Sequence, residues 1–195
     1  MKCDIILSGV GGQGILSIAA VIGEAVRAEG LNIKQAEVHG MSQRGGDVQT
    51  NLRISSEPIA SDLIPLGGAD AIISLEPMEA LRYLPYLKSD GWVVTSSKPF
   101  INIPNYPETE AIMAKLRELP NVLMTDVEQV AAEAGVARSA NIVLLGAASS
   151  ILGIEAEDLK SGIERIFSRK GEKIVEMNHK AFEVGMKSVA EQLKR

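Results

Sequence analysis

The feature that most constrains the fold of this chain is a pair of glycine-rich segments, each of which follows a short apolar run. The first, residues 9–14 (GVGGQG), follows Cys3–Ser8 and leads into a stretch rich in Ala, Ile and Val. The second, residues 39–46 (HGMSQRGG), follows Asn32–Val38. A buried strand, a glycine turn and a helix together begin a parallel α/β unit. We therefore expect both segments at one edge of an α/β sheet, where backbone N–H groups can face a phosphate or carboxylate.

The rest of the chain alternates strand-like and helix-like segments. We expect further strands over 48–55, 69–75, 91–96 and 122–125, and helices over 14–29, 77–84, 110–119, 127–134, 141–152, 157–167 and 173–193. Residues 48–55 alternate in polarity, which places that strand at an edge or antiparallel to the others. Three prolines within 97–109 predict an extended excursion there. The prediction is a single Rossmann-like α/β domain over 1–195, with an open, mostly parallel sheet, helices on both faces and a helical C-terminal region from about residue 150.

Composition argues against several classes of protein. Cys3 is the only cysteine, so the chain forms no internal disulfide and cannot by itself hold an iron–sulfur cluster, which usually takes four thiolates. The two histidines, His39 and His179, lie far apart, and we expect no metal site. A net charge of −5 without a Lys/Arg cluster argues against binding to nucleic acid or to an anionic membrane. Apolar runs fall short of the about 20 residues that span a bilayer, so we expect a soluble, cytoplasmic protein.

The first glycine segment has two interpretations. Gly9, Gly11 and Gly14 match the G-x-G-x-x-G spacing of dinucleotide-binding folds. Glu37 ends the second strand, where such folds place an acid that binds ribose. The alternative is a tight strand-to-helix turn, whose glycines only permit close packing. Gln13 is unusual in the fingerprint, and a nicotinamide enzyme has no standard use for a second glycine segment, so the packing interpretation is favoured.

The second segment carries an arginine between a glutamine and two glycines. Arg44 could bring its guanidinium group to a planar anion, or it could fasten the segment through a structural ion pair. Ser42 lacks the surroundings of a hydrolase nucleophile, and His39 is expected to bind a backbone carbonyl. We assign no catalytic residue. The candidate binding or subunit-contact residues are Gly9, Gly11, Gly12, Gln13, Gly14, Ser42, Gln43, Arg44, Gly45 and Gly46.

Four further polar residues receive structural interpretations. Asn141 is expected to cap the helix that follows it, with a binding role as the alternative. Asp62, Asp70 and Glu76 have no spacing that indicates a metal site or an acid–base pair, so surface solvation or capping accounts for each.

The two glycine segments, together with Glu37 and Val38, resemble the gamma-type domain of the 2-oxoacid:ferredoxin oxidoreductases. The likeness continues through 48–51, 68–70 and 75–81 and through Arg138 and Asn141, so it covers nearly the whole chain. Its most specific part is the run from Ser42 to Gly46.

This resemblance implies a subunit of a complex that oxidatively decarboxylates aryl 2-oxoacids such as indolepyruvate. Coenzyme A would be the cosubstrate, and the products would be arylacetyl-CoA, CO2 and reduced ferredoxin. Thiamine diphosphate and [4Fe–4S] clusters are expected in a larger alpha subunit, because this chain has one cysteine and lacks a Gly-Asp-Gly thiamine motif; Asp90-Gly91 lacks the first glycine. That subunit and, through the complex, ferredoxin are the expected partners, and the chain alone is expected to bind no cofactor and to be inactive.

Three alternatives stay open at this point. The chain could be the gamma subunit for pyruvate, 2-oxoglutarate or 2-oxoisovalerate. It could be an independent NAD(P)- or FAD-binding protein. It could also be a scaffold without a catalytic role, whose glycine segments only contact a partner protein.

Overall fold

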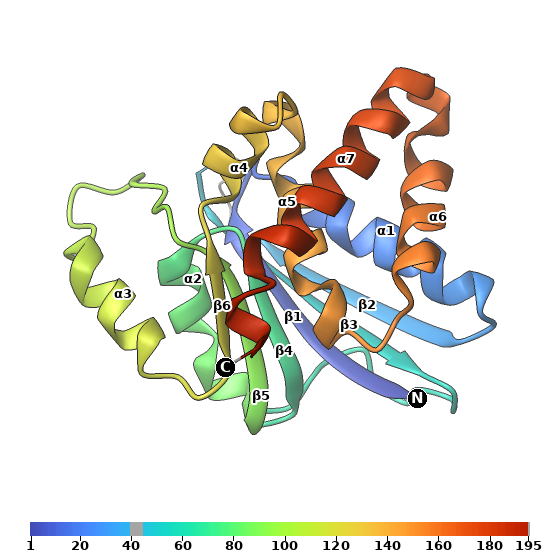
Figure 1. Ribbon diagram of the computed structural model, residues 1–195. Coiled ribbons are helices and arrows are strands. Elements are labelled where there is room, and N and C mark those ends of the chain that lie inside the picture. The colour runs from blue at the N-terminus through green and yellow to red at the C-terminus, as the bar shows by residue number, and fades with distance from the viewer. Residues whose placement is uncertain (40–44, 195) are drawn as a thin grey trace.

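The computed structural model describes residues 1–39 and 45–194 and contains a six-stranded sheet in the order β2-β3-β1-β4-β5-β6 (Figure 1). The strands are β1 (Lys2–Val10), β2 (Asn32–His39), β3 (Asp47–Ser55), β4 (Ala69–Ser74), β5 (Leu87–Ser96) and β6 (Val122–Thr125). Neighbours among β1, β4, β5 and β6 pair in parallel, whereas β3 pairs antiparallel with both β1 and β2. The predicted mostly parallel sheet is therefore confirmed.

Strand β3 is antiparallel to both of its neighbours, which confirms one of the two alternatives predicted from its alternating polarity; it does not lie at an edge. The edge strand is β2, and β3 lies between β2 and β1. Because β3 runs against β1, its first residue, Asp47, pairs with Val10 at the end of β1. This register brings the chain after the second glycine segment back to the place where the first one begins.

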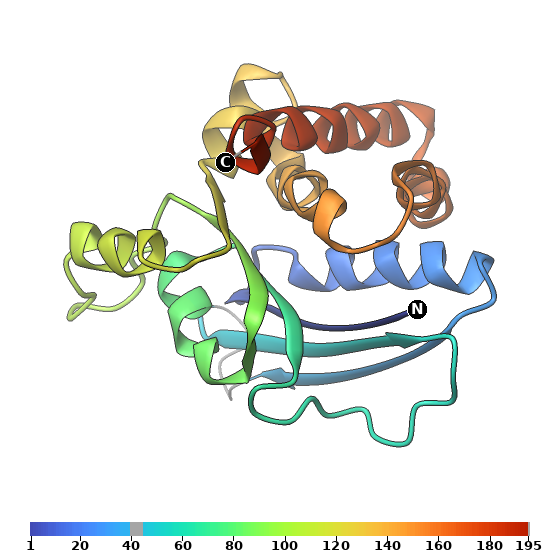
Figure 2. The ribbon, with the colours of Figure 1, turned by 60° about the horizontal axis from the view of Figure 1, so that its bottom comes forward.

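Helices cover both faces of the sheet, as predicted. They are α1 (Ile15–Ala28), α2 (Pro77–Arg82), α3 (Thr109–Arg117), α4 (Val127–Glu133), α5 (Ala140–Ala148), α6 (Ala156–Phe167) and α7 (Glu172–Val189). Side chains of α1 and of α4 to α7 share one hydrophobic core with one face of the sheet, and α2 and α3 pack on the other. Figure 2 shows α7, in dark red, on the far side of α5 from the sheet. The C-terminal helices thus add a second helical layer. Among the described residues, no helix has both the length and the apolarity needed to cross a bilayer.

Helices α5 and α7 cross at two glycines. A Cβ atom added at Gly146 would lie 2.0 Å from the carbonyl oxygen of Phe182, and one at Gly185 would lie 2.0 Å from that of Val143. The two glycines therefore allow the backbones of α5 and α7 to approach closely. The predicted helix over 141–152 ends earlier, at Ala148, and continues as a 3-10 turn.

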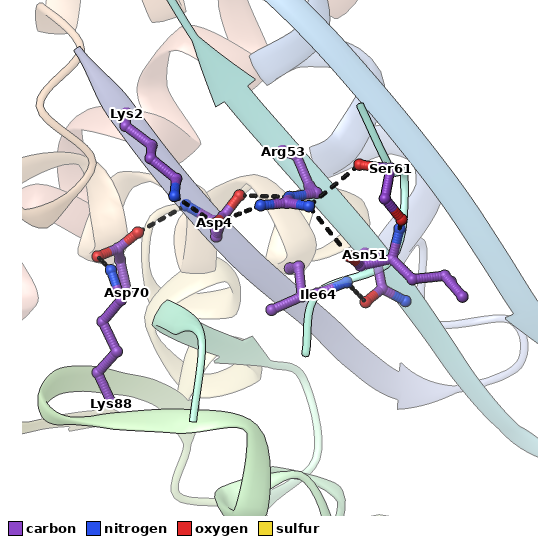
Figure 3. A network of polar contacts seen from close by, with 9 residues as sticks. Lys2, Asp4, Asn51, Arg53, Ser61, Ile64, Asp70 and Lys88 are labelled. Atoms are coloured by element: carbon purple, nitrogen blue, oxygen red, sulfur yellow. Dashed lines mark hydrogen bonds and ion pairs between the residues drawn. The ribbon is translucent and has the colours of Figure 1, made fainter. Parts of the chain in front are cut away.

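On the face of β1 and β3 opposite α1, the sheet is covered by the loop that follows β3 (Figure 2), and side chains of the sheet contact this loop (Figure 3). Arg53 of β3 donates to both carboxylate oxygens of Asp4, at 2.7 and 3.0 Å, and to the carbonyls of Ser61 and Leu63 in that loop, at 3.1 Å each. Asn51 accepts the backbone N–H of Ile64 at 3.1 Å. The side chains of Asn51 and Arg53 therefore have hydrogen-bond partners on this face, which explains how an alternating strand can lie inside the sheet.

Candidate functional site

The two glycine segments predicted from the sequence touch each other through their backbones. The N–H of Gly11 donates to the carbonyl of Gly46 at 2.8 Å, and the N–H of Gly45 donates to the carbonyl of Gly11 at 3.3 Å. Ser42, Gln43 and Arg44 lie outside the described residues, as does the side chain of His39, so their roles stay predictions.

The glycines of the first segment differ in what surrounds them. A Cβ atom at Gly9 would lie 2.9 Å from the side-chain oxygen of Gln13, and one at Gly14 would lie 2.8 Å from the amide nitrogen of Asn141. Gly12 has φ +105° and no atom within 4 Å of such a Cβ. Gly9 and Gly14 therefore permit close packing, whereas Gly12 provides a turn beside open space.

The side chain of Gln13 braces the first segment from within. Its Oε1 accepts the N–H of Val10 at 2.7 Å, and its Nε2 donates to the carbonyl of Leu75, which follows β4, at 3.2 Å. Both ends of the amide are thus occupied inside the protein. This geometry gives Gln13 a supporting role and leaves contact with a ligand to the backbone next to it.

Asn141 does not cap a helix, so that prediction is wrong. Helix α5 begins at Ala140, and a 3-10 turn over Ala137–Ser139 precedes it. Asn141 therefore lies inside the first turn, where its Nδ2 donates to the carbonyl of Gly14 at 3.1 Å. The side chain joins α5 to the residue that precedes α1.

A cavity of about 360 Å³ opens beside the first segment. Its lining includes Gly11, Gly12 and Gly14, the first residues of α1, and Glu37 on β2. In the described part of the chain no side chain caps α1, and no acid lies in its first turn, so its N–H groups and dipole favour an anion. A carboxylate at Glu37 favours a hydroxyl or N–H donor instead. The cavity therefore suits a ligand that carries both phosphate and hydroxyl groups.

A partly buried polar network behind the second segment was missed by the sequence interpretation. The hydroxyl of Tyr83 donates to Asp47 at 2.6 Å, and Arg82 donates to both oxygens of Glu79, at 2.7 and 3.2 Å. Burial raises the pKa of Glu79, Arg82 opposes this shift, and the nearby Asp47 carboxylate adds to it. Because Asp47 directly follows Gly46, the network fixes the start of β3. Asp47 and Tyr83 are 36 residues apart, so no local spacing could reveal it.

Glu76 ties a third segment to the same region. It is fully buried and caps α2, since its Oε2 accepts the N–H of Glu79 at 2.9 Å. Its Oε1 accepts the N–H of Phe100 at 3.3 Å and the hydroxyl of Tyr106, and both residues lie in the extended segment predicted over 97–109. In the same extended segment, the side chain of Asn102 donates to the carbonyl of Gly45 at 2.5 Å. The excursion thus reaches the second glycine segment.

The expectations for the three acids have different outcomes. Capping is confirmed for Glu76, and Asp62 is exposed to solvent as expected. Asp70 neither caps nor stays free in solvent: it pairs with Lys88 and accepts the N–H of Asp4 at 2.8 Å, away from the glycine segments (Figure 3).

Exposed apolar side chains gather around the glycine segments. Of the ten large apolar residues that are exposed in the described chain, five lie at this edge: Leu16, Val38, Phe100, Ile101 and Ile103. Val38 is 52% exposed and Ile101 is 67% exposed. A concentration of apolar surface of this kind is typical of a surface that another protein covers.

Comparison with known proteins gives consistent matches in sequence. The family description "Pyruvate ferredoxin/flavodoxin oxidoreductase" matches residues 4–188. The indolepyruvate oxidoreductase subunit IorB of Pyrococcus horikoshii is 39% identical, over 97% of each chain. IorB of Archaeoglobus fulgidus is 37% identical, over 95% of this chain and 94% of that one. The 2-oxoglutarate synthase subunit KorC of A. fulgidus is 27% identical, over 94% and 86%.

Solved structures share the fold. The gamma subunit of a keto/oxoacid ferredoxin oxidoreductase from Geobacter sulfurreducens superposes with a TM-score of 0.73 at 25% identity, over 97% of each chain. A 2-oxoglutarate:ferredoxin oxidoreductase from Magnetococcus marinus, solved with 2-oxoglutarate, coenzyme A and succinyl-CoA bound, superposes with a TM-score of 0.75 at 24% identity. The match covers 97% of this chain but 31% of that one, whose polypeptide is much longer.

Proposed function

The chain belongs to the pyruvate ferredoxin/flavodoxin oxidoreductase family, and from this premise we propose that it is the small subunit of an indolepyruvate:ferredoxin oxidoreductase. Two relatives named for indolepyruvate match nearly its full length at 37% and 39% identity. The relative named for 2-oxoglutarate matches at 27%. This difference favours an aryl 2-oxoacid over the other 2-oxoacids, and relatives that are subunits of oxidoreductases do not support an independent NAD(P)- or FAD-binding protein.

The assembled enzyme would convert indolepyruvate and coenzyme A into indoleacetyl-CoA and CO2, with oxidised ferredoxin as the electron acceptor. We assign thiamine diphosphate and [4Fe–4S] clusters to a larger partner subunit, where they would supply carbanion stabilisation and electron transfer. In this chain, burial and, to a smaller extent, the nearby Asp70 carboxylate raise the pKa of the Cys3 thiol to about 12. A single protonated thiol cannot replace the four thiolates that such a cluster usually takes.

The observation that carries this subunit's own role is the cavity beside the first glycine segment. Coenzyme A has phosphates and a ribose hydroxyl, the two kinds of group that the cavity suits. We therefore assign its nucleotide part to this cavity, with the phosphates near Gly12 and the start of α1 and the hydroxyl near Glu37. The apolar residues around the cavity would contact the larger subunit and close the site against water.

The test introduces a negative charge at Gly12 of the reconstituted enzyme. Gly12→Asp should raise the KM for coenzyme A at least about tenfold, a loss of about 1.4 kcal/mol of binding, without changing the KM for indolepyruvate. Gly12→Ala separates charge from backbone strain and should have a smaller effect. Gly30→Asp is the matched control, because Gly30 also has positive φ (+73°) and open space but follows the far end of α1. An active Gly12→Asp enzyme with an unchanged KM for coenzyme A contradicts the assignment.

A further inference from the structure

A second cavity, of about 570 Å³, lies between the helical layers and shares no lining residue with the first. Its wall combines the 3-10 turn before α5, the end of α6 and the first half of α7. Phe167, Ile174 and Met177 supply an apolar surface. A cavity of this size, mostly apolar with a few polar groups, is typical of a small-molecule site.

The charges on this wall are positive. Arg138 and Lys170 line the cavity, and none of the residues that line it is acidic. Neither cation forms an ion pair with a residue of the described chain. Lys170 instead lies over the ring of Phe167, with its Nζ 5.3 Å from the ring centre. Two cations beside an apolar surface favour an organic anion.

The side-chain amide of Asn178 on the same wall favours a ligand that carries a hydrogen-bond donor. Asn178 is 4% exposed, and its Nδ2 donates to the carbonyl of Ile174, one turn earlier in α7, at 2.8 Å. In the described part of the chain, no hydrogen bond reaches its Oδ1. Solvent reaches this oxygen, so it is available to accept a hydrogen bond from an N–H or O–H group of a ligand in the cavity.

We propose that this cavity binds an indole carboxylate, with the carboxylate at Arg138 and Lys170, the ring on Phe167 and Met177, and the ring N–H at Asn178. The choice of an indole acid, among aromatic anions that carry a donor, rests on the proposed function. The site is separate from the coenzyme A cavity, so an indole acid bound here would be an additional ligand of the subunit.

The test is calorimetric titration of the purified full chain with indole-3-acetate. We expect saturable binding to one site, weakened at least about tenfold by Arg138→Gln and by Lys170→Gln. Lys180→Gln, at an exposed position of α7 that does not line the cavity, is the matched control and should leave binding unchanged. Benzofuran-3-acetate, which lacks the ring N–H, should bind more weakly to the wild type. The preference for the indole should disappear in Asn178→Leu.

Three outcomes would overturn the proposal. They are the absence of saturable binding, equal binding by the Arg138→Gln and Lys170→Gln variants, and inorganic phosphate binding as tightly as indole-3-acetate, which would leave the apolar wall without a role. Arg138 and Lys170 are exposed, so their variants keep the test decisive even if Asn178→Leu does not fold. Ligand binding by this chain is measured apart from turnover by the complex, so the failure of either proposal is recognised separately.

Discussion

At the scale of single residues, the first glycine segment depends on side chains that brace it. Gln13 satisfies the N–H of Val10 and the carbonyl of Leu75, and Asn141 holds the carbonyl of Gly14. The G-x-G-x-x-G spacing predicted a turn at this place. The bracing contacts could not be predicted, because Leu75 and Asn141 are 62 and 127 residues from their partners.

We predict that Gln13→Ala lowers the free energy of unfolding by about 2 kcal/mol, because a partly buried N–H and a carbonyl lose their partners. Urea denaturation measures this change. Gln129→Ala is the control: Gln129 is exposed on α4 and bonds only to Glu133 and to its own helix cap, so the change should stay within about 0.5 kcal/mol. An equally small change for Gln13→Ala would mean that its amide is free to serve a ligand.

At the scale of elements, the C-terminal helices are held by a close backbone crossing. Gly146 on α5 and Gly185 on α7 leave no room for a side chain between the two helices. The sequence predicted a helical region from about residue 150, and α6 and α7 confirm it. The hydrophobic pattern alone could not identify the element on which α7 packs, which is helix α5 and not the sheet.

Gly185→Ala should therefore destabilise the protein by about 3 kcal/mol, because the added methyl group meets backbone atoms that cannot rotate away. The same substitution in an open helix raises stability. Gly23→Ala in α1 provides that comparison, since its nearest contact would be the Cδ1 of Ile33 at an ordinary 3.5 Å, and we expect a gain of about 0.5 kcal/mol. Thermal unfolding of both variants separates the two cases; a stable Gly185→Ala protein would contradict the close crossing.

At the scale of the whole molecule, topology assembles the site. The end of β1, the start of β3 and the extended segment before α3 meet at one edge of the sheet. This edge carries the cavity and half of the exposed large apolar residues of the described chain. The α/β class and the meeting of strands with glycine turns could be predicted from sequence. The position of β3 inside the sheet could not be predicted from the sequence. It depends on hydrogen bonds that Arg53 and Asn51 form with the loop after β3, and no local pattern reveals them.

We propose that this edge completes an enzyme whose redox cofactors lie in another subunit. The direct measurement is ferredoxin reduction by the larger subunit, with and without this chain, in the presence of coenzyme A and each of indolepyruvate, pyruvate and 2-oxoglutarate. We predict turnover only when both chains are present, with kcat/KM for indolepyruvate at least about tenfold above the others. Full activity of the larger subunit alone, or a preference for 2-oxoglutarate or pyruvate, would contradict the proposed function of this subunit.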